Sequence, residues 1–335
     1  MMKQFLGILL LFALLTALLP FAALLLPQST GGQSAPAVPA ASQPQPSAAS
    51  PSGETVSLLD EATGEVLTVP VEQYLIGAVA AELPADYQPE ALKAQAVASH
   101  SYLLACREAN QQKEELKGAW LAVNTKARQG YVTDEVLRAM WGDAYEENYA
   151  KFSQALSGLA KQVLTYDGKP ALACYHAISR GQTESSENVW GQPLPYLVSV
   201  DSSYDLTADG YLDTVTYTPQ EMSDMLSVNF IGADLSGAPA EWFGEPVRTE
   251  AGYVKELPVK GGVSLNAQDF RQALGLRSCD FTIEYGDGRF IITTKGYGHG
   301  VGMSQTGANL MALTGKTYQE ILAHYYPGAV LSEAA

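Results

Sequence analysis

Cysteine, histidine and basic residues are all scarce in this chain of 335 residues. It holds three Cys, four His, and 20 Lys or Arg against 36 Asp or Glu, so its formal net charge is −16. A disulfide-stapled miniprotein is excluded, and three Cys, an odd number, predict no disulfide framework. Nucleic-acid binding through charge is excluded too, because phosphates attract clustered Lys and Arg. The spacings HExxH and CxxC, typical of metal sites, do not occur.

One long apolar run lies at the N-terminus. Residues 5–26 form 22 positions without a charge, and Lys3 precedes them. A helix of this length spans roughly 33 Å, enough to cross the hydrocarbon layer of a membrane. We expect 1–26 to be a cytoplasmic N-terminus and a membrane anchor, with the rest of the chain outside the cytoplasm by the positive-inside rule. A cleaved signal peptide is the alternative, and it also exports the remainder.

Residues 27–53 have a different composition. Six Pro stand among Ser, Ala, Gln and Gly, with no charged or aromatic residue. Such a segment has too little apolar area to bury, so we expect a disordered linker that holds a domain away from the membrane. The exported domain is then 54–335.

The exported domain mixes helices and strands without a regular βαβ order. We expect hairpins at 56–59 with 66–69, at 163–166 with 171–176, and at 281–285 with 289–294. We expect helices at about 71–83, 89–114, 133–140, 145–160, 218–226, 266–274, 304–314 and 317–325. This pattern predicts an α+β fold with short antiparallel strands. Residues 203–285 are expected to form a smaller lobe inserted in the main one.

Glu82 is the first candidate for chemistry. It continues the apolar stripe of Leu75, Ala78 and Val79 and lies in the last turn before Pro84. Burial and the negative end of the helix dipole both disfavour a carboxylate and raise its pKa. A carboxyl that is protonated near neutral pH suits a general acid. The alternative is a Glu that turns to solvent at a frayed helix end.

Two further clusters hold polar residues. Cys174 and His176 share one face of a predicted strand, which is compatible with metal ligation, with a thiol–imidazole pair, or with a hydrogen-bonding His at the rim of a groove. The loop 296–305 alternates Gly with His299, Ser304 and Gln305. Its spacing is not GxGxxG, so it indicates a ligand-facing loop or a tight turn rather than a phosphate site.

Four separated motifs resemble the stage II sporulation protein D (SpoIID) family. They occur in the family's order and together span roughly 54–332. Their sequences are VEQYLIGAVAAELPADYQPEALKAQAVASHSY from position 71, YHAISRGQTESSENVWGQPLPYLVSV from 175, GYGHGVGMSQTGANLMA from 296 and ILAHYYPGAVL from 321.

The resemblance implies a lytic transglycosylase of peptidoglycan that acts in engulfment during endospore formation. Such an enzyme cuts the β-1,4 bond between N-acetylmuramic acid and N-acetylglucosamine in strands without stem peptides, and leaves 1,6-anhydro-N-acetylmuramic acid ends. Glu82 matches the family's catalytic glutamate. We expect no cofactor and no metal. The candidate substrate-binding residues are His100, Tyr175, His176, Ser179, Arg180, Thr183, Trp190, Tyr196, His299, Ser304 and Gln305.

The sequence departs from the family pattern at several positions. His100 replaces a usual Arg, and Val198 stands near a usual Lys. We therefore expect Arg180 to restore a cation to the groove. Some members bind zinc through Cys and His, but the matching segment 123–142 has neither.

The resemblance also implies partners. These are glycan strands, a SpoIIP-like amidase and a SpoIIM-like membrane scaffold, with the amidase acting first because stem peptides would clash with a groove for bare sugar. A non-catalytic enhancer of a cell-wall amidase is the alternative function. A peptidase built on Cys174 and His176 is a third.

Overall fold

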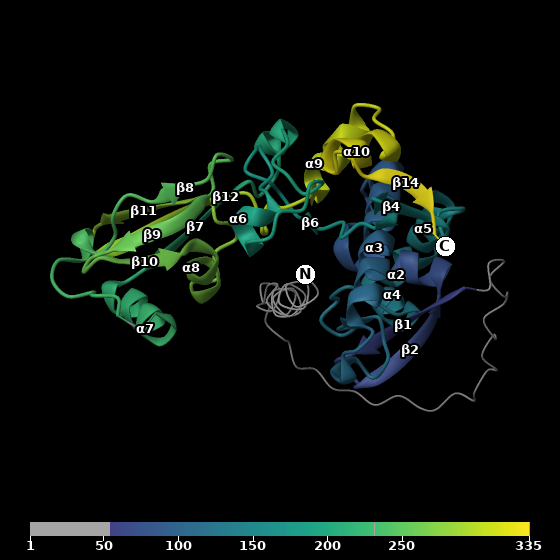
Figure 1. The fold of residues 1–335 in the computed structure, drawn as a ribbon, viewed down its shortest axis with the longest axis horizontal. Coiled ribbons are helices and arrows are strands. Elements are labelled where there is room, and N and C mark those ends of the chain that lie inside the picture. Colours follow the sequence, from purple (N-terminus) through teal and green to yellow (C-terminus); the bar gives the residue numbers. More distant parts are fainter. Residues whose placement is uncertain (1–53, 231, 335) are drawn as a thin grey trace, which may run out of the picture.

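The computed structural model describes residues 54–230 and 232–334. The predicted anchor and linker lie outside the described residues. Within the described ranges, no helix combines the length and the apolar character needed to cross a membrane. Helices alternate irregularly with short strands, and the predicted α+β class is confirmed. The described residues form two large hydrophobic clusters and a small third one of Leu59, Leu116 and Ala119. Figure 1 shows the two large clusters as two groups of elements side by side.

The first cluster is built around α3 (Pro89–Asn110), which packs against α2, α5, α9, α10 and β4. Ala91, Ala94, Ala96 and Ala98 on α3 are all buried, and such small side chains let neighbouring helices approach closely. Pro89 begins the helix, where the missing N–H costs nothing. The elements of this part are β1 (Thr55–Asp60), β2 (Glu65–Pro70), α2 (Val71–Glu82), η1 (Glu114–Leu116), β3 (Leu121–Val123), α4 (Asp134–Trp141), η2 (Gly142–Ala144), α5 (Tyr145–Leu156), β4 (Gln162–Tyr166), β5 (Lys169–Pro170), α9 (Gln305–Leu313), α10 (Tyr318–Tyr325) and β14 (Val330–Glu333).

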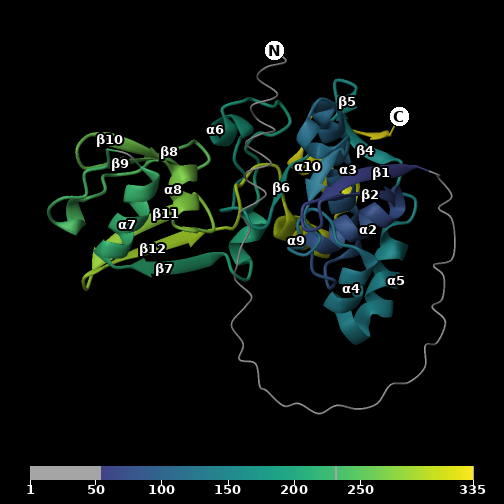
Figure 2. The ribbon, with the colours of Figure 1, turned by 90° about the horizontal axis from the view of Figure 1, so that it is seen from below.

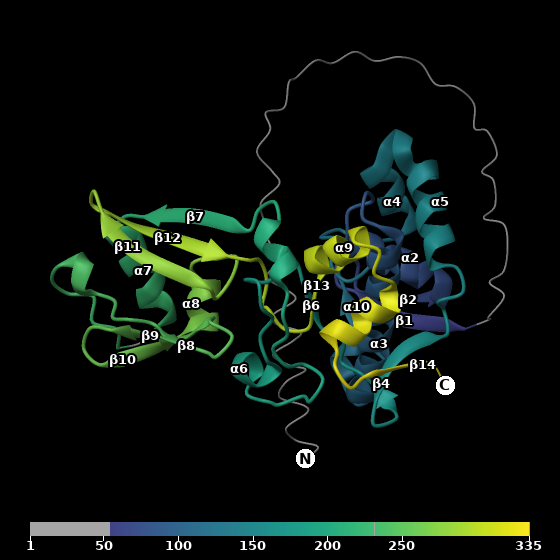
Figure 3. The same ribbon diagram turned by 90° about the horizontal axis from the view of Figure 1, so that it is seen from above.

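The second cluster holds hydrophobic residues between Val215 and Ile292. It lies between two antiparallel sheets, of order β11-β12-β7 and β10-β9-β8, and two helices. Helix α7 packs against β7 and β12, and α8 packs against β9 and β10, as Figures 2 and 3 show from opposite sides. Hairpin β11–β12 belongs to this cluster, beyond residue 285. The elements are β7 (Leu212–Tyr217), α7 (Pro219–Asn229), η4 (Pro239–Glu241), β8 (Val247–Arg248), β9 (Val254–Val259), β10 (Val263–Asn266), α8 (Ala267–Ala273), β11 (Phe281–Gly286) and β12 (Arg289–Lys295).

The junction between the two parts is polar. It includes β6 (Tyr175–His176), α6 (Ser186–Trp190), η3 (Ser203–Thr207) and β13 (Met303–Ser304). Asp280, whose side chain is only 5% exposed, accepts a hydrogen bond from Arg180 Nε and another from Arg248 Nη1, both at 2.8 Å. Tyr253 adds a hydroxyl bond to the carbonyl of Gln182 at 2.9 Å. These bonds tie the second part to the segment that follows β6.

Two of the predicted hairpins form as expected, and one does not. β1 pairs with β2, and β11 pairs with β12, in antiparallel register. The prediction that 171–176 continues the hairpin with 163–166 is wrong, because the paired strand stops at Pro170. Tyr175 and His176 instead pair in parallel with Met303 and Ser304. β1 and β3 also pair in parallel, so the strands are not all antiparallel.

Glycine explains the change of partner at β6. Gly302 has φ +74°, and a Cβ there would lie 2.0 Å from the carbonyl oxygen of Cys174. Only a residue without a side chain lets β13 approach β6 this closely. The Cys174 carbonyl accepts bonds from the Met303 amide at 3.1 Å and the Tyr326 hydroxyl at 2.7 Å. The glycine-rich loop thus fixes β6 against the first hydrophobic cluster.

Candidate active site

Glu82 is the last residue of α2. The stripe of Leu75, Ala78 and Val79 is buried, and Glu82 follows on the same side of the helix with its side chain only partly exposed. No basic residue lies in the last turn of α2. Leu83 then takes an extended conformation before Pro84, as expected for the residue that precedes a proline. Glu82 therefore stands at a fixed helix end and not on a frayed terminus.

Three distant segments meet at the Glu82 carboxyl. The side chains of Gln305 and Tyr175 and the backbone of Gly130 hydrogen-bond it. Gln305 is the first residue of α9, and Tyr175 lies on β6. Burial is the largest influence and raises the pKa of Glu82 to about 7, while the three hydrogen bonds lower it. Near neutral pH the group can therefore both give and take a proton.

A chain of buried polar side chains supports these partners from α3. Gln305 Nε2 donates to Gln95 Oε1 at 3.4 Å, and Gln95 Nε2 donates to Ser99 Oγ at 3.1 Å. The Ser99 side chain also hydrogen-bonds Tyr175. The sequence analysis did not single out Gln95, Ser99 or Gly130. The spacing of Gln95 and Ser99, four residues apart on an apolar helix, is the pattern that could have revealed them.

Of the described residues, none with a negative charge shifts the Glu82 pKa. Asp205 is fully buried and is held by Ser179 N at 2.9 Å, Ser202 Oγ at 2.9 Å and Ser304 Oγ at 2.9 Å. Its carboxylate is thus occupied by donors. The site can perform acid–base chemistry with a single carboxyl.

Several predicted residues serve the fold around the site. Ser304 caps α9 by accepting from the Gly307 amide at 3.1 Å, and it is buried like Ser179. Thr183 accepts from the Val200 amide at 2.9 Å. The Tyr196 hydroxyl accepts from the Leu172 amide at 2.9 Å. The structure places these four side chains in the interior and not at the Glu82 carboxyl.

His176, His299 and Trp190 form a ring cluster behind Tyr175. The ring centroids of His176 and His299 are 5.8 Å apart, and those of Trp190 and His299 are 5.1 Å apart. His299 accepts from the Val301 amide at 3.0 Å and hydrogen-bonds the Tyr175 backbone. Burial lowers the pKa of His176 to about 4 and that of His299 well below its usual range. Both imidazoles are therefore neutral at neutral pH.

His100 and Arg180 lie elsewhere. His100 is 2% exposed and faces β4, with Nδ1 3.3 Å from the carbonyl oxygen of Gln162. Arg180 is engaged by Asp280 and by the carbonyl of Ala251 at 2.8 Å, and it does not shift the Glu82 pKa. The charge of Arg180 thus joins the two parts of the chain, and the expectation that Arg180 supplies a cation to the groove stays a prediction.

The cysteines show no sign of nucleophilic chemistry. All three are free thiols and buried, and burial raises the pKa of Cys174 well above its usual range. His176 directs Nδ1 to the carbonyl of Val301 at 3.2 Å and not to Cys174. Across 54–230 and 232–334 there is no group of three or more His, Cys, Asp or Glu that could hold a metal ion. A thiol–imidazole pair at Cys174 is not formed.

Several known proteins are similar in sequence to this chain. The family model described as "SpoIID: Stage II sporulation protein" matches residues 60–166. The chain is 39% identical over 269 residues to stage II sporulation protein D of Bacillus amyloliquefaciens, which covers 80% of this chain and 76% of that protein. It is 38% identical over 273 residues to stage II sporulation protein D of Bacillus subtilis, with 82% and 77% covered. The chain therefore belongs to the stage II sporulation protein D family, a family of sporulation proteins.

A more distant relative carries a different name. The amidase enhancer of Bacillus subtilis is 28% identical over 306 residues, which covers 77% of this chain and 40% of that protein.

Proposed function

We propose that this chain is a lytic transglycosylase of peptidoglycan with Glu82 as its acid and base. The observation that carries this proposal is one half-buried carboxyl with a pKa of about 7, fixed by Tyr175 and Gln305 and with no second carboxylate acting on it. Most glycoside hydrolases use two carboxyl groups, one as the acid and one as the nucleophile or the base for water. An enzyme that uses a hydroxyl of its own substrate needs only one.

The reaction then takes two proton transfers at the same group. Protonated Glu82 gives its proton to the glycosidic oxygen of the β-1,4 bond between N-acetylmuramic acid and N-acetylglucosamine, and that bond breaks. The resulting carboxylate takes the proton of the C6 hydroxyl, whose oxygen bonds to C1 and closes the 1,6-anhydro ring. The nucleophile is part of the same sugar, so it has a large entropic advantage over water.

Tyr175 and Gln305 act as positioning residues in this scheme. Both hydrogen bonds favour the carboxylate and lower the Glu82 pKa, while burial favours the acid. The two influences together bring the pKa near neutral pH, where a group that must both give and take a proton works best.

The cellular setting forms part of the same proposal. Residues 1–26 anchor the chain in the cell membrane, and 54–335 act outside the cytoplasm on glycan strands during engulfment in spore formation. An amidase that removes stem peptides acts first, and a membrane scaffold holds both enzymes. Membership of a sporulation family supports this setting, as does an amidase enhancer among the relatives.

The test compares the full chain with Glu82→Gln and with Glu108→Gln, a control at an exposed position of α3. Each protein is incubated with peptide-free glycan strands, and the products are weighed by mass spectrometry. We expect anhydro ends, about 18 Da lighter than hydrolysis products because no water is added, from the wild type and the control. Glu82→Gln should lose at least about a hundredfold in rate. Reducing ends, or full activity in Glu82→Gln, would contradict the proposal.

The amidase-enhancer relative supports a second candidate function, a non-catalytic protein that binds glycan and stimulates an amidase. The same Glu82→Gln protein separates the two. An enhancer keeps its stimulation of the amidase when Glu82 is replaced, and it produces no anhydro ends even as the wild type.

A further inference from the structure

Four side chains and the Glu82 carboxyl form a closed ring of hydrogen bonds. Gln305 Nε2 donates to Gln95 Oε1 at 3.4 Å, and Gln95 Nε2 donates to Ser99 Oγ at 3.1 Å. The side chains of Ser99 and Tyr175 bond each other. Tyr175 and Gln305 both bond Glu82. The ring therefore begins and ends at the carboxyl.

The side of the ring that lies on α3 is closed to water. Gln95 and Ser99 stand four residues apart on one face of this helix, and both are at most 3% exposed. Gln305 is 7% exposed. An unmatched polar group in such a place costs free energy. Each donor in the ring must therefore meet an acceptor of the ring.

The Glu82 carboxylate sets the direction of every bond in the ring. A carboxylate only accepts, so Gln305 presents Nε2 to Glu82, and the second N–H of that group points to Gln95. Gln95 then turns its own Nε2 to Ser99. Ser99 accepts this bond and gives its proton to the Tyr175 hydroxyl. Tyr175 in turn gives its proton to Glu82.

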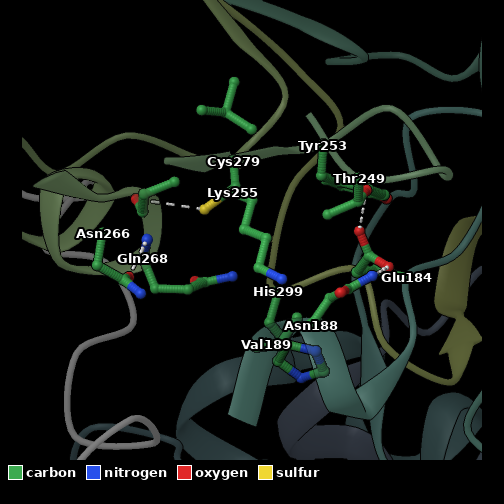
Figure 4. Close-up of a pocket in the computed structure, with 12 residues that line it drawn as sticks. Glu184, Asn188, Val189, Thr249, Tyr253, Lys255, Asn266, Gln268, Cys279 and His299 are labelled. Carbon is green, nitrogen blue, oxygen red and sulfur yellow. Dashed lines mark hydrogen bonds between the residues drawn. The ribbon is translucent and has the colours of Figure 1, made fainter. Parts of the chain in front are cut away.

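The backbone of Tyr175 is held separately, so the ring decides only where its hydroxyl points. Tyr175 pairs with Met303 across β6 and β13. His299, whose side chain lines the small cavity of Figure 4, hydrogen-bonds the Tyr175 backbone. These contacts place the aromatic side chain, but its O–H can still rotate and can donate or accept. Ser99 supplies the missing constraint, because its donated proton makes the Tyr175 oxygen an acceptor on that side.

Three donors leave one position of the Glu82 carboxyl open. A carboxylate has about four acceptor positions. Tyr175, Gln305 and the Gly130 backbone fill three of them. A proton that binds Glu82 without displacing a donor takes the remaining position. A Tyr175 hydroxyl that turned away would instead let Glu82 direct its proton to the Tyr175 oxygen, where a substrate cannot receive it.

Resting on the proposed function, we propose that Gln95 and Ser99 are positioning residues that keep Tyr175 a donor to Glu82, and that they thereby hold the acid proton of Glu82 at the open carboxyl position. Both are buried and act through their neighbours. When Glu82 gives its proton to the glycosidic oxygen, Tyr175 and Gln305 already point at the carboxylate that remains. No member of the ring has to turn between the acid step and the base step.

The first experiment measures the pKa of Glu82 without turnover. The full chain is labelled with a carbon isotope at the carboxyl groups of Glu and titrated by NMR, and the Glu82 signal is the one that Glu82→Gln removes. A double-mutant cycle combines Ser99→Ala with Tyr175→Phe, each of which removes only a hydroxyl. Burial raises the pKa of Tyr74 and Tyr175, the titratable neighbours on which the Glu82 charge acts, so both stay neutral in this range.

We expect Ser99→Ala to raise the Glu82 pKa by roughly 0.5, because a Tyr175 hydroxyl without its donor stabilises the carboxylate less. Tyr175→Phe should raise it by about 1, since the whole bond is lost. Adding Ser99→Ala to Tyr175→Phe should then change nothing, because Ser99 acts through the hydroxyl that is gone.

Ser101→Ala is the matched control. Ser101 is another buried serine of α3, but it bonds the backbone of Val97 and Leu164 and takes no part in the ring. Its replacement should lower stability and leave the Glu82 pKa unchanged. The inference is overturned if Ser99→Ala leaves that pKa unchanged, if its effect persists in the Tyr175→Phe protein, or if Ser101→Ala matches it.

Turnover of peptide-free glycan strands is the second readout. At pH values well below 7 Glu82 is protonated, so a change in its pKa no longer affects the rate. We still expect Ser99→Ala to lower kcat about threefold there, because part of the molecules direct the Glu82 proton to Tyr175. KM should stay the same, since Ser99 is buried. An unchanged kcat at low pH would overturn the role in placing the proton.

The two proposals fail in different ways. Anhydro products together with a Glu82 pKa that ignores Ser99→Ala would overturn the positioning role and leave the reaction standing. A Glu82 pKa that depends on Ser99 only through Tyr175, without anhydro products from the wild type, would overturn the reaction and support the ring as the device that directs the Glu82 proton.

Discussion

At the residue scale, Glu82 shows how one position can be tuned by opposing influences. A carboxyl buried beside apolar α2 residues lacks the water that would stabilise its ionised form, and this raises its pKa. Hydrogen bonds from Tyr175, Gln305 and the Gly130 backbone stabilise the charged form and lower the pKa again in part. Ionising Glu82 therefore costs free energy in the folded protein, and this cost makes the stability of the protein depend on pH.

The direction in which stability changes with pH follows from the linkage between protonation and folding. The pKa of Glu82 is about 7 in the folded protein and near 4.5 when unfolded, so the unfolded state ionises first and stability falls as pH rises from about 4.5 to 7. We expect Glu82→Gln to stabilise the protein at pH 8, by up to about 3 kcal/mol, and to change little at pH 4. Thermal unfolding of the full chain at both pH values measures this.

Glu320→Gln is a control that should change the stability in the opposite direction. Thr317 and Lys316 lower the pKa of Glu320 to about 2, so its contribution is present above pH 4.5 and is lost as pH falls toward 2. Its replacement should lower stability at pH 8. If the gain in stability of Glu82→Gln over the wild type is no larger at pH 8 than at pH 4, the pKa of Glu82 is not raised in the folded protein.

At the scale of single elements, the two-residue strand β6 governs the site. It carries Tyr175 toward Glu82 and leaves His176 on the other face, near His299. So short a strand holds its register only because β13 pairs with it, and that pairing depends on a glycine contact. The glycine-rich loop, strand β6 and the Glu82 carboxyl are thus structurally connected.

Gly302→Ala tests this connection. Its φ of +74° strains any side chain, and the added Cβ would meet the Cys174 carbonyl at 2.0 Å. We expect a loss of at least about 2 kcal/mol in urea unfolding and a lower rate on glycan strands, because β6 must move. Gly315→Ala is the matched control, since Gly315 has φ +90° but nothing within 4 Å of the new atom. Equal losses in both proteins would mean that backbone strain alone matters.

At the scale of the whole molecule, two hydrophobic clusters are joined by a polar junction. Asp280 holds Arg180 and Arg248 together, and Tyr253 adds a bond to the Gln182 carbonyl. Buried ion pairs contribute little net stability but are costly to break on one side only, because an uncompensated charge stays behind. The junction therefore fixes orientation more than it stabilises the fold.

Asp280→Ala should cost about 3 kcal/mol in the free energy of unfolding, because both guanidinium groups lose their buried partner. Asp213→Ala removes an exposed pair with Arg277 at 3.4 Å, with side chains 39% and 30% exposed, and should cost less than about 1 kcal/mol. Urea titrations of the two full-length variants compare them directly. If both lose the same small amount, the junction does not depend on Asp280.

Local patterns in the sequence allowed much of the fold to be predicted. The apolar stripe of α2, Pro at the start of α3 and the hairpin turns all act within a few residues, so the helix and strand positions could be read from them. The same stripe indicated the burial of Glu82. The partners of β6 could not be read in this way, because hydrophobic periodicity does not say which of two distant strands will pair.

The sequence by itself determined the α+β class, the helices and the position of a carboxyl at an apolar helix end, since all depend on neighbours along the chain. The four motifs also indicated the family, which the relatives then established. Only the tertiary structure decided that Gln305, Tyr175 and Gly130 meet Glu82 and that Arg180 pairs with Asp280. Hydrogen bonding and desolvation depend on distances between segments that are far apart in the sequence, such as those of Glu82 and Gln305, and tertiary packing sets those distances.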